Sequence, residues 1–543
     1  MKKQILYALA VVLIFAACSK KMLREDEIIQ KRDVLESAQP NLLLSSVIQK
    51  SAYTYYGLGG VNSTLLSVTM QYMQGNRGAG DNIYQGFQNP KGDLYSLTSQ
   101  IKLVQAAIGI VHDKKLKVYE GIFTIFKSLL WSATTDLYGD IYYTEGLRGQ
   151  DGILFPKFDD QKDIYPALIL DLKNAVQLMT EGTETIDNTY DLFYAGDKTK
   201  WIKLANSLRL RLLMRVVTKL PSAPSDIAAL AASPLISDTP ENASIPFQGG
   251  DRTYSWPMGA LYMGYTDNFL LNRPSKTLID SLKALNDERL KVWAAPVERP
   301  WTNVKADNGK KETIVQKGYS YDVTWEYLDR TNAQIRNVYP LIQDSLTYFA
   351  GYPAGTYINA LASNGSWQFP DTKWNYKISI FSKLINENAN PLLRAVIIQA
   401  DEVQFLLAEA AVKGYISGSP ENYYKAGVTM ALKRWGETIP ANYFSSKAAA
   451  FPVNGTNNQK LAKIALQKWL GLFMMGVESY VDFRRTRLPA MEANGELPMS
   501  AVKFPLRYRY PETEMSNNAI NYKAAISKLD QGDTEKSKMW LVQ

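Results

Sequence analysis

The chain has 543 residues, of which 46% are hydrophobic and 21% charged, and this ordinary globular composition excludes a wholly disordered protein. Its formal net charge is +8 at pH 7, but basic residues alternate with acidic ones and form no dense stripe, so we expect no nucleic-acid partner. With one histidine and one cysteine, the sequence excludes a Cys/His zinc site and an internal disulfide, and we expect no metal and no cofactor.

The N-terminus has the features of a secretory signal peptide. Two lysines precede a short apolar run from Ile5 to Phe15, and small residues then lead to Cys18. The run is shorter than the roughly 20 residues of a membrane-spanning helix, so we expect residues 1–17 to be cleaved. Small residues directly before a cysteine resemble a bacterial lipobox, in which the cysteine is acylated. We therefore predict that Cys18 carries a membrane-anchoring lipid.

The next segment, residues 18–40, is charged and poor in aromatic side chains. Such a segment buries little apolar surface, which argues against a packed element. We interpret it as a tether between the lipid and the folded part of the protein.

Helical periodicity dominates both ends of the mature chain. Apolar residues recur three and four positions apart from Leu116 to Ala133, and Gly139 then provides a C-terminal stop. The same spacing predicts helices over 94–111, 115–138, 162–179, 200–219, 392–413, 421–435, 459–475 and 516–529. Neighbouring helices suggest stacked helix-turn-helix units, although the sequence does not contain the consensus motif of a repeat of roughly 34 residues.

The middle of the chain, about 240–390, has a different character. It holds nine of the 24 prolines and six of the 11 tryptophans, which favours loops over helices. Two further stretches, 74–93 and 139–160, are also irregular. Long loops in a compact protein are commonly functional, and we expect the ligand at the 74–93 and 240–390 segments.

Tryptophans in these irregular segments are the leading candidates for ligand contact. A flat aromatic face packs against the apolar face of a sugar ring or against a peptide side chain, while nearby polar groups orient the ligand. The predicted contacts are Trp301, Trp325 and Trp367, with Arg77, Asn82 and Tyr84 as orienting partners. Burial in the core is the competing interpretation for each tryptophan, and it is the expected one for Trp469, which lies on a helical stripe.

An enzyme is the main alternative to a binding protein. His112 lies at the end of a predicted helix beside lysines, which is a poor setting for a catalytic triad, so no catalytic residue is predicted. Two carboxylates suffice for glycoside hydrolysis, however, and Asp322 and Glu326 beside Trp325 are the pair to test. A scaffold without any small ligand is the third alternative.

Several motifs follow one another between residues 130 and 490. The sequence reads DLYGDIYY at 136–143, FPKFDDQKDIY at 155–165, WIKLANSLRLR at 201–211, EVQFLLAEAA at 402–411, QKW at 467–469, GVE at 476–478 and DFRRT at 482–486. In this order they resemble the signature of the SusD-like (SusD/RagB) outer-membrane lipoproteins of Bacteroidetes. The resemblance covers nearly the whole mature chain.

The resemblance implies an all-α fold of tetratricopeptide-like helix pairs, with a loop-rich, Trp-rich region of about 240–390 that faces the ligand. It implies a single domain over residues 41–543. It also implies a nutrient-binding lipoprotein of the cell outer membrane, anchored by lipid through Cys18 and facing the cell exterior. Such a protein captures an oligosaccharide or a peptide for a SusC-like TonB-dependent transporter and is not an enzyme. The alternative is a lipid-anchored helical glycan-degrading enzyme.

The charged residues within these motifs are interpreted as structural. Arg209, Arg211 and Arg215 lie in a Leu-rich helix, where they cover apolar surface and pair with carboxylates such as Glu402 or Glu409. Arg484 and Arg485, which follow Glu478 and Asp482, are interpreted in the same way, with a phosphate or carboxylate site as the alternative. Asp136, near the glycine that ends its helix, is expected to cap or to form a turn.

Overall fold

The computed structural model of the chain describes residues 39–59, 64–75, 84–91, 93–264, 272–332, 348–352, 377–491 and 503–543. The signal peptide and most of the 18–40 segment lie outside these residues. So do four of the residues predicted to bind lipid or ligand, namely Cys18, Arg77, Asn82 and Trp367.

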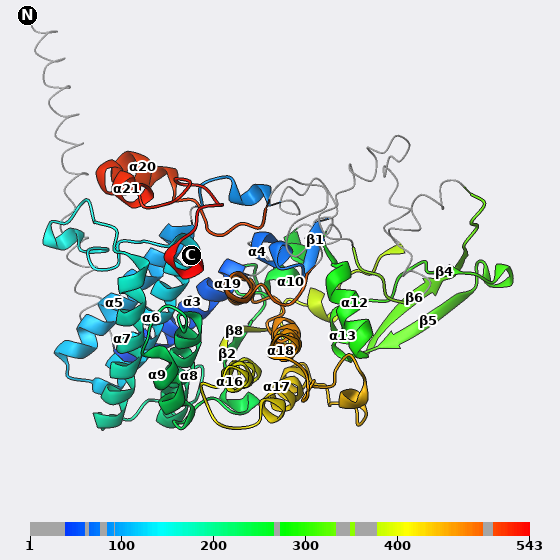
Figure 1. The fold of residues 1–543 in the computed structure, drawn as a ribbon, viewed down its shortest axis with the longest axis horizontal. Coiled ribbons are helices and arrows are strands. Elements are labelled where there is room, and N and C mark those ends of the chain that lie inside the picture. Colours follow the sequence, from blue (N-terminus) through cyan, green and yellow to red (C-terminus); the bar gives the residue numbers. More distant parts are fainter. Residues whose placement is uncertain are drawn as a thin grey trace, which may run out of the picture.

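Helices build the left and centre of the molecule (Figure 1). On the left lie α5 (Asp93–Asp113), α6 (Lys117–Tyr138), α7 (Gln161–Glu181), α8 (Lys198–Arg215) and α9 (Ala223–Ala231), and in the centre lie α16 (Ala400–Val412), α17 (Pro420–Arg434) and α18 (Asn457–Gly471). The remaining helices are α3 (Pro40–Gly59), α4 (Thr64–Thr69), α10 (Pro257–Gly264), α12 (Lys276–Leu285), α13 (Arg289–Trp293), α19 (Gly476–Thr486), α20 (Glu512–Asn517) and α21 (Ala519–Ile526). Helices that follow one another along the chain pack as pairs, α5 with α6, α6 with α7 and α16 with α17. The predicted helical fold of helix pairs is confirmed, with a few short strands added.

Helix α6 occupies the middle of the left-hand group. Almost all of its side chains are buried, since α5 packs on one side and α7 on the other. Gly121 lets α6 and α7 approach closely, because a Cβ atom there would lie 2.7 Å from the carbonyl oxygen of Ala175. The helix ends at Gly139, whose φ of 89° favours glycine and whose N–H donates to the carbonyl of Thr135.

The strands of the described residues form four two-stranded sheets. Antiparallel pairs join β1 (Met73–Gly75) to β3 (Asn272–Pro274), β2 (Ala243–Pro246) to β8 (Arg394–Ile398) and β5 (Lys311–Gln316) to β6 (Tyr319–Thr324), and a parallel pair joins β4 (Trp301–Thr302) to β7 (Glu326–Tyr327). All four are short, so helix packing rather than a sheet forms the core.

The β5–β6 hairpin projects to the right of the helices (Figure 1). Its register runs from Lys311 opposite Thr324 to Gln316 opposite Tyr319. The loop between them is Lys317-Gly318, and both residues have positive φ, as a two-residue type I′ turn requires. Trp325 lies between β6 and β7, at the open end of the hairpin opposite the turn. This position is beside β4, because β4 pairs with β7.

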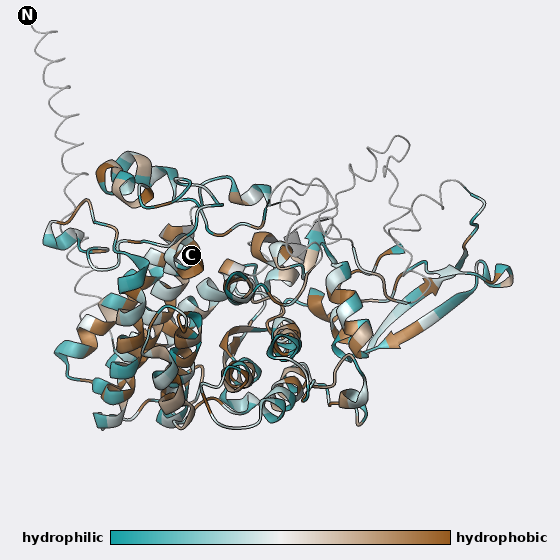
Figure 2. Cartoon of the chain, viewed as in Figure 1, coloured by the Kyte–Doolittle hydropathy of each residue, from teal (hydrophilic) through white to brown (hydrophobic). Residues whose placement is uncertain are grey.

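One hydrophobic core connects the helices, and the region of the β5–β6 hairpin packs against it through Tyr319 and Phe349. The core extends in sequence from Leu43 in α3 to Leu541 near the C-terminus. Figure 2 shows hydrophobic residues concentrated within the packed helices, whereas loops and outer turns are mostly hydrophilic. None of the helices described here is long and apolar enough to cross a membrane.

The structure differs from the predicted elements in several places. Helix α3 was not predicted, and the predicted helix 516–529 is two short helices, α20 and α21. The predicted helix 392–413 is a strand followed by a helix, because the buried β-branched residues Val396, Ile397 and Ile398 pair with β2 as part of β8. The segment 240–390, predicted to be loop-rich, also contains α10, α12 and α13. Helix α12 carries a clear start signal, since Ser275 caps it by accepting from the backbone N–H of Leu278.

Candidate functional site

Charged residues from the sequence motifs meet in the protein interior. Arg211 of α8 donates to both carboxylate oxygens of Glu402 of α16, at 2.6 and 2.7 Å. One turn further along α8, Arg215 pairs with Asp136 of α6 at 2.5 Å and with Glu478 of α19. All five side chains are at most 6% exposed. This network joins four helices and confirms the predicted pairing of Arg211 with Glu402.

Asp136 does not have the capping role that the sequence suggested. Its side chain is fully buried, and it accepts hydrogen bonds from Arg215 and from the hydroxyl of Tyr165. Burial raises the pKa of Asp136, although Arg215 opposes the shift. Burial alone would also raise the pKa of Glu478, but Arg211 and Arg215 outweigh it and lower that pKa to about 2. A fully paired buried network of this kind holds the helices together and offers no free group for chemistry.

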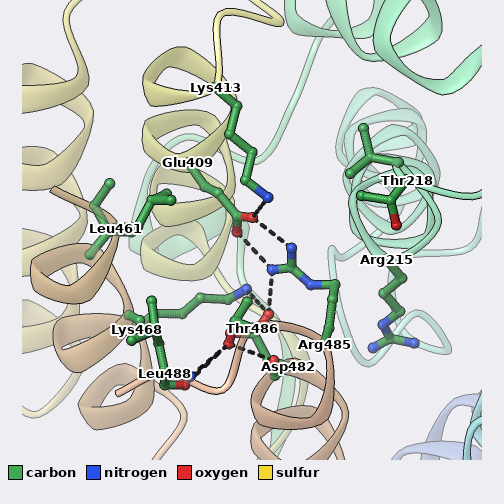
Figure 3. A pocket seen from close by; sticks show the side chains of 13 residues that line it. Arg215, Thr218, Glu409, Lys413, Leu461, Lys468, Asp482, Arg485, Thr486 and Leu488 are labelled. Carbon is green, nitrogen blue, oxygen red and sulfur yellow. Dashed lines mark hydrogen bonds and ion pairs between the residues drawn. The ribbon is translucent and has the colours of Figure 1, made fainter. Parts of the chain in front are cut away.

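A second set of ion pairs borders a cavity of about 200 Å³ (Figure 3). Arg485 of α19 donates to both oxygens of Glu409 at 2.6 and 2.7 Å and to Asp482 at 2.8 Å. Lys468 of α18 donates to Asp482 at 2.9 Å, and Lys413 lies 2.8 Å from Glu409. Three of the motifs therefore supply the wall of one cavity.

Trp325 lies at the end of the hairpin in a small group of aromatic residues. Its indole Nε1 donates to Oε1 of Glu312 at 2.5 Å, and the hydroxyl of Tyr348 donates to the same oxygen at 3.0 Å. The two rings meet edge to face, with centroids 5.4 Å apart. Trp325 is partly exposed, and Tyr348 is 37% exposed. We call Trp325, Tyr348 and Glu312 the aromatic cluster; it holds two rings in fixed positions at the surface.

Trp301 lies on β4 next to this cluster, since it is opposite Glu326 in the parallel pairing of β4 with β7. Only 3% of it is exposed. The Nζ of Lys377 lies 3.3 Å from the centroid of its ring and donates to Glu326 at 2.6 Å. Burial lowers the pKa of Lys377 to about 8. A cation of the protein thus already covers one face of Trp301, which is a buried neighbour of the cluster rather than a free surface.

Tyr84 is placed in the interior, apart from the aromatic cluster. It is 1% exposed, and its ring packs edge to face on Phe504. In this structure Tyr84 therefore has the surroundings of a core residue. Of the six predicted ligand residues, the structure brings Trp301 and Trp325 together, whereas Arg77, Asn82 and Trp367 lie outside the described residues.

An open groove of about 680 Å³ lies between the loop after β2 and the segment 386–389. It is lined by Gln248, Gly249, Gly250, Met263, Asn386, Glu387, Asn388 and Ala389. The buried Oδ1 of Asn386 has no hydrogen-bond partner in the described part of the chain, and Met263 is 44% exposed. Amide and carboxylate groups suit the hydroxyls of a polar ligand. The groove lies within the 240–390 segment that the sequence predicted to face the ligand, but its lining residues were not predicted, because its two sides are more than a hundred residues apart.

The two carboxylates that the sequence analysis named as a possible catalytic pair, Asp322 and Glu326, both have partners within the protein. Asp322 of β6 is exposed and accepts from the hydroxyl of Thr313 at 2.8 Å. Glu326 of β7 is paired with Lys377 at 2.6 Å and with Arg299 at 3.2 Å. Both oxygens of Glu326 are therefore engaged in ion pairs, and Asp322 and Glu326 are not arranged as a free pair of carboxylates. Within the described ranges, no cluster of His, Cys, Asp and Glu is arranged to hold a metal ion.

Comparisons with known proteins agree with this fold. Residues 32–511 match the sequence profile of a family named SusD-like and described as starch-binding and associating with the outer membrane. Similar solved structures include a SusD homologue from Bacteroides fragilis (18% identity, TM-score 0.70), a chitin-binding protein (22%, 0.70) and an outer membrane protein from Bacteroides vulgatus described as involved in nutrient binding (20%, 0.71). Each similarity covers 93% of this chain and 100% of the other. No curated protein has a significantly similar sequence.

Proposed function

Because the chain belongs to the SusD-like family, we propose that it is a lipid-anchored protein of the outer membrane that captures oligosaccharides for a SusC-like TonB-dependent transporter. The observation that carries the proposal is the family match over residues 32–511, which includes the hairpin, the groove and the described helices from α3 to α19. The family consists of binding proteins that are not enzymes. The proposed activity is therefore capture and delivery without bond cleavage.

Two surface features support a sugar rather than a peptide as the ligand. The aromatic cluster offers flat apolar rings of the kind that pack on sugar rings, and Glu312 fixes their orientation. The groove offers the amides of Gln248, Asn386 and Asn388, which can both donate to and accept from hydroxyl groups. Neither feature carries the cationic side chains that would favour an acidic peptide.

The family description and one of the similar structures suggest two kinds of sugar chain, starch and chitin. Retention of the purified protein on insoluble starch and on insoluble chitin, followed by titration with the matching oligosaccharides and with a mixture of short peptides, separates the ligand classes. We expect retention on at least one polysaccharide. Binding to peptides alone would replace the oligosaccharide proposal with a peptide one.

The lipid anchor and the transporter are also part of the proposal. Helix α3 begins at Pro40, where the proposed tether from Cys18 ends, and the core that joins Leu43 to Leu541 supports a single domain over residues 41–543. A permanent complex with a transporter would bury well over the roughly 1,600 Å² of a standard interface. Co-purification from outer membranes in mild detergent at native expression tests it. We expect the transporter to be recovered with this chain, and recovery of the chain alone would count against a stable complex.

A further inference from the structure

The cavity in Figure 3 has a mixed lining of apolar and charged side chains. It lies between the end of α8 and the helices α16, α18 and α19. The apolar lining residues are Val217, Leu461, Ile464, Ala465 and Leu488, and the polar ones are Arg215, Thr218, Glu409, Lys413, Lys468, Asp482, Arg485 and Thr486. A ligand that fills this space would meet both hydrocarbon and charged groups.

The charged side chains of the lining carry a surplus of positive charge. The three cations Lys413, Lys468 and Arg485 share only two carboxylates, Glu409 and Asp482. The fourth cation of the lining, Arg215, already pairs with Asp136 and Glu478 in the neighbouring network. One positive charge at the cavity is therefore left without a carboxylate of its own.

Several N–H donors of these side chains are also unused. The Nε of Arg485 is buried without a hydrogen-bond partner among the described residues, and the side chain of Arg485 is only 10% exposed. The ammonium group of Lys468, 5% exposed, has one hydrogen bond, to Asp482, although it can donate three. Buried donors without acceptors are costly, so an anion with free lone pairs would be stabilised here.

The volume limits what such an anion can be. An engineered protein cavity of about 150 Å³ admits benzene, so the 200 Å³ here accommodate a benzene-sized body together with a carboxylate group. Inorganic phosphate would leave the apolar lining residues uncovered. We propose that this cavity binds a small organic monocarboxylate, with its carboxylate among Lys413, Lys468 and Arg485 and its apolar body against Leu461 and Ile464. This site is separate from the aromatic cluster and the groove, and it does not depend on the proposed oligosaccharide function.

Benzoate and its neutral isostere benzamide are suitable probes, measured by calorimetry and by melting temperature on the purified mature protein. We expect saturable one-to-one binding of benzoate, with benzamide and inorganic phosphate at least tenfold weaker. Lys413→Met should weaken benzoate binding at least tenfold, because it removes the surplus charge. The matched control is Lys433→Met, since Lys433 also lies at a helix C-terminus and pairs with one carboxylate, Asp238, away from the cavity.

A second variant keeps the test independent of the ion pairs. Thr218 is exposed and lines the rim of the cavity, so Thr218→Trp should obstruct entry and abolish benzoate binding without disturbing the fold. Three results would each overturn the proposal: benzamide binding as tightly as benzoate, full benzoate affinity in both variants, or no benzoate binding to the wild-type protein at millimolar concentration.

Discussion

Trp325, between β6 and β7, and Trp301, on β4, are neighbours but have different surroundings. Trp325 is partly exposed and is held in place by Glu312, whereas Trp301 is buried beneath Lys377. From the sequence both were predicted to contact the ligand, because both are tryptophans in a proline-rich region. The difference arises from tertiary contacts with Lys377, which is 76 residues after Trp301 in the chain and could not be read from local pattern.

We expect Trp325→Ala to weaken oligosaccharide binding by about 1–3 kcal/mol, the scale of one aromatic contact. The melting temperature should change little, because the side chain is only partly buried. Calorimetric titration and melting curves measure the two quantities. An unchanged affinity would remove Trp325 from the site.

Trp301→Ala should instead lower the free energy of unfolding by about 3 kcal/mol, as expected for a large-to-small change at a buried position. Trp469→Ala is the matched control, because Trp469 is also 3% exposed and stacks on Tyr72 in the helical core. Chemical denaturation of both variants is the measurement. If Trp301→Ala were as stable as wild type while Trp469→Ala was not, Trp301 would not be a supporting residue.

Asp401 in α16 links stability to pH. Burial raises its pKa from 3.8 to about 7, and nearby Arg434 only partly opposes the shift. Between these two pH values the folded protein holds a proton that the unfolded chain releases, so the free energy of unfolding falls as pH rises from about 4 to 7. The slope from one such group is at most about 1.4 kcal/mol per pH unit. Above pH 7 this contribution no longer changes.

Asp401→Asn should remove that slope, since the amide does not titrate. Denaturation of wild type and variant at pH 5 and at pH 8 gives the comparison, and the variant should gain stability relative to wild type at pH 8. Cations lower the pKa values of Glu478 and Glu409 in the folded protein, so the stabilisation from these two groups is lost as pH falls into the acidic range. Wild type and variant share this contribution, and it cancels in the comparison. Parallel pH profiles for the two proteins would contradict the account.

Helix α8 shows how one element combines exposed and buried charge. Arg209 forms a 3.4 Å pair with Asp226 at the protein edge, whereas Arg211 and Arg215 are buried in the network with Glu402 and Glu478. The Leu-rich pattern of this helix indicated that its arginines are structural. It could not indicate which ones are buried, because all three are spaced within two turns of the helix.

Arg211→Met should lower the free energy of unfolding by about 3–5 kcal/mol, since it leaves Glu402 buried without its cation. Arg209→Met on the same helix is the control, with an expected cost of at most about 1 kcal/mol for a partly exposed pair. Denaturant midpoints of the two variants decide the matter. Equal losses would mean that the network is not the feature that joins the helices.

At the level of elements, periodicity predicted most of the long helices well, but it missed α3, and it predicted poorly those segments that combine a strand and a helix. Helix α6 was predicted within two residues, because its apolar spacing and its terminal glycine agree. The segment 392–413 was predicted as one helix, since its Val396–Ile398 run is apolar in either state and only pairing with β2 makes it a strand. The groove likewise joins Gln248 to Asn388, and such a long-range contact leaves no local signal in the sequence.

The whole molecule is expected to act from a membrane surface. Cys18 lies well before α3 and outside the described residues, so Cys18→Ser should leave the fold unchanged while releasing the protein from the membrane or blocking its maturation. Membrane fractionation in cells that lack the transporter measures this, with melting curves as the control for folding. Retention of the variant in the outer membrane at the wild-type level would exclude lipid attachment at Cys18.

The central claim is that this protein binds oligosaccharides and does not cleave them. The most direct test is calorimetric titration of the purified protein with starch and chitin oligosaccharides, followed by chromatography of the recovered sugar. The account predicts saturable binding of at least one series, with every sugar recovered at its original length. Shortened sugars that disappear with Glu326→Gln, or no binding to any oligosaccharide, would contradict it.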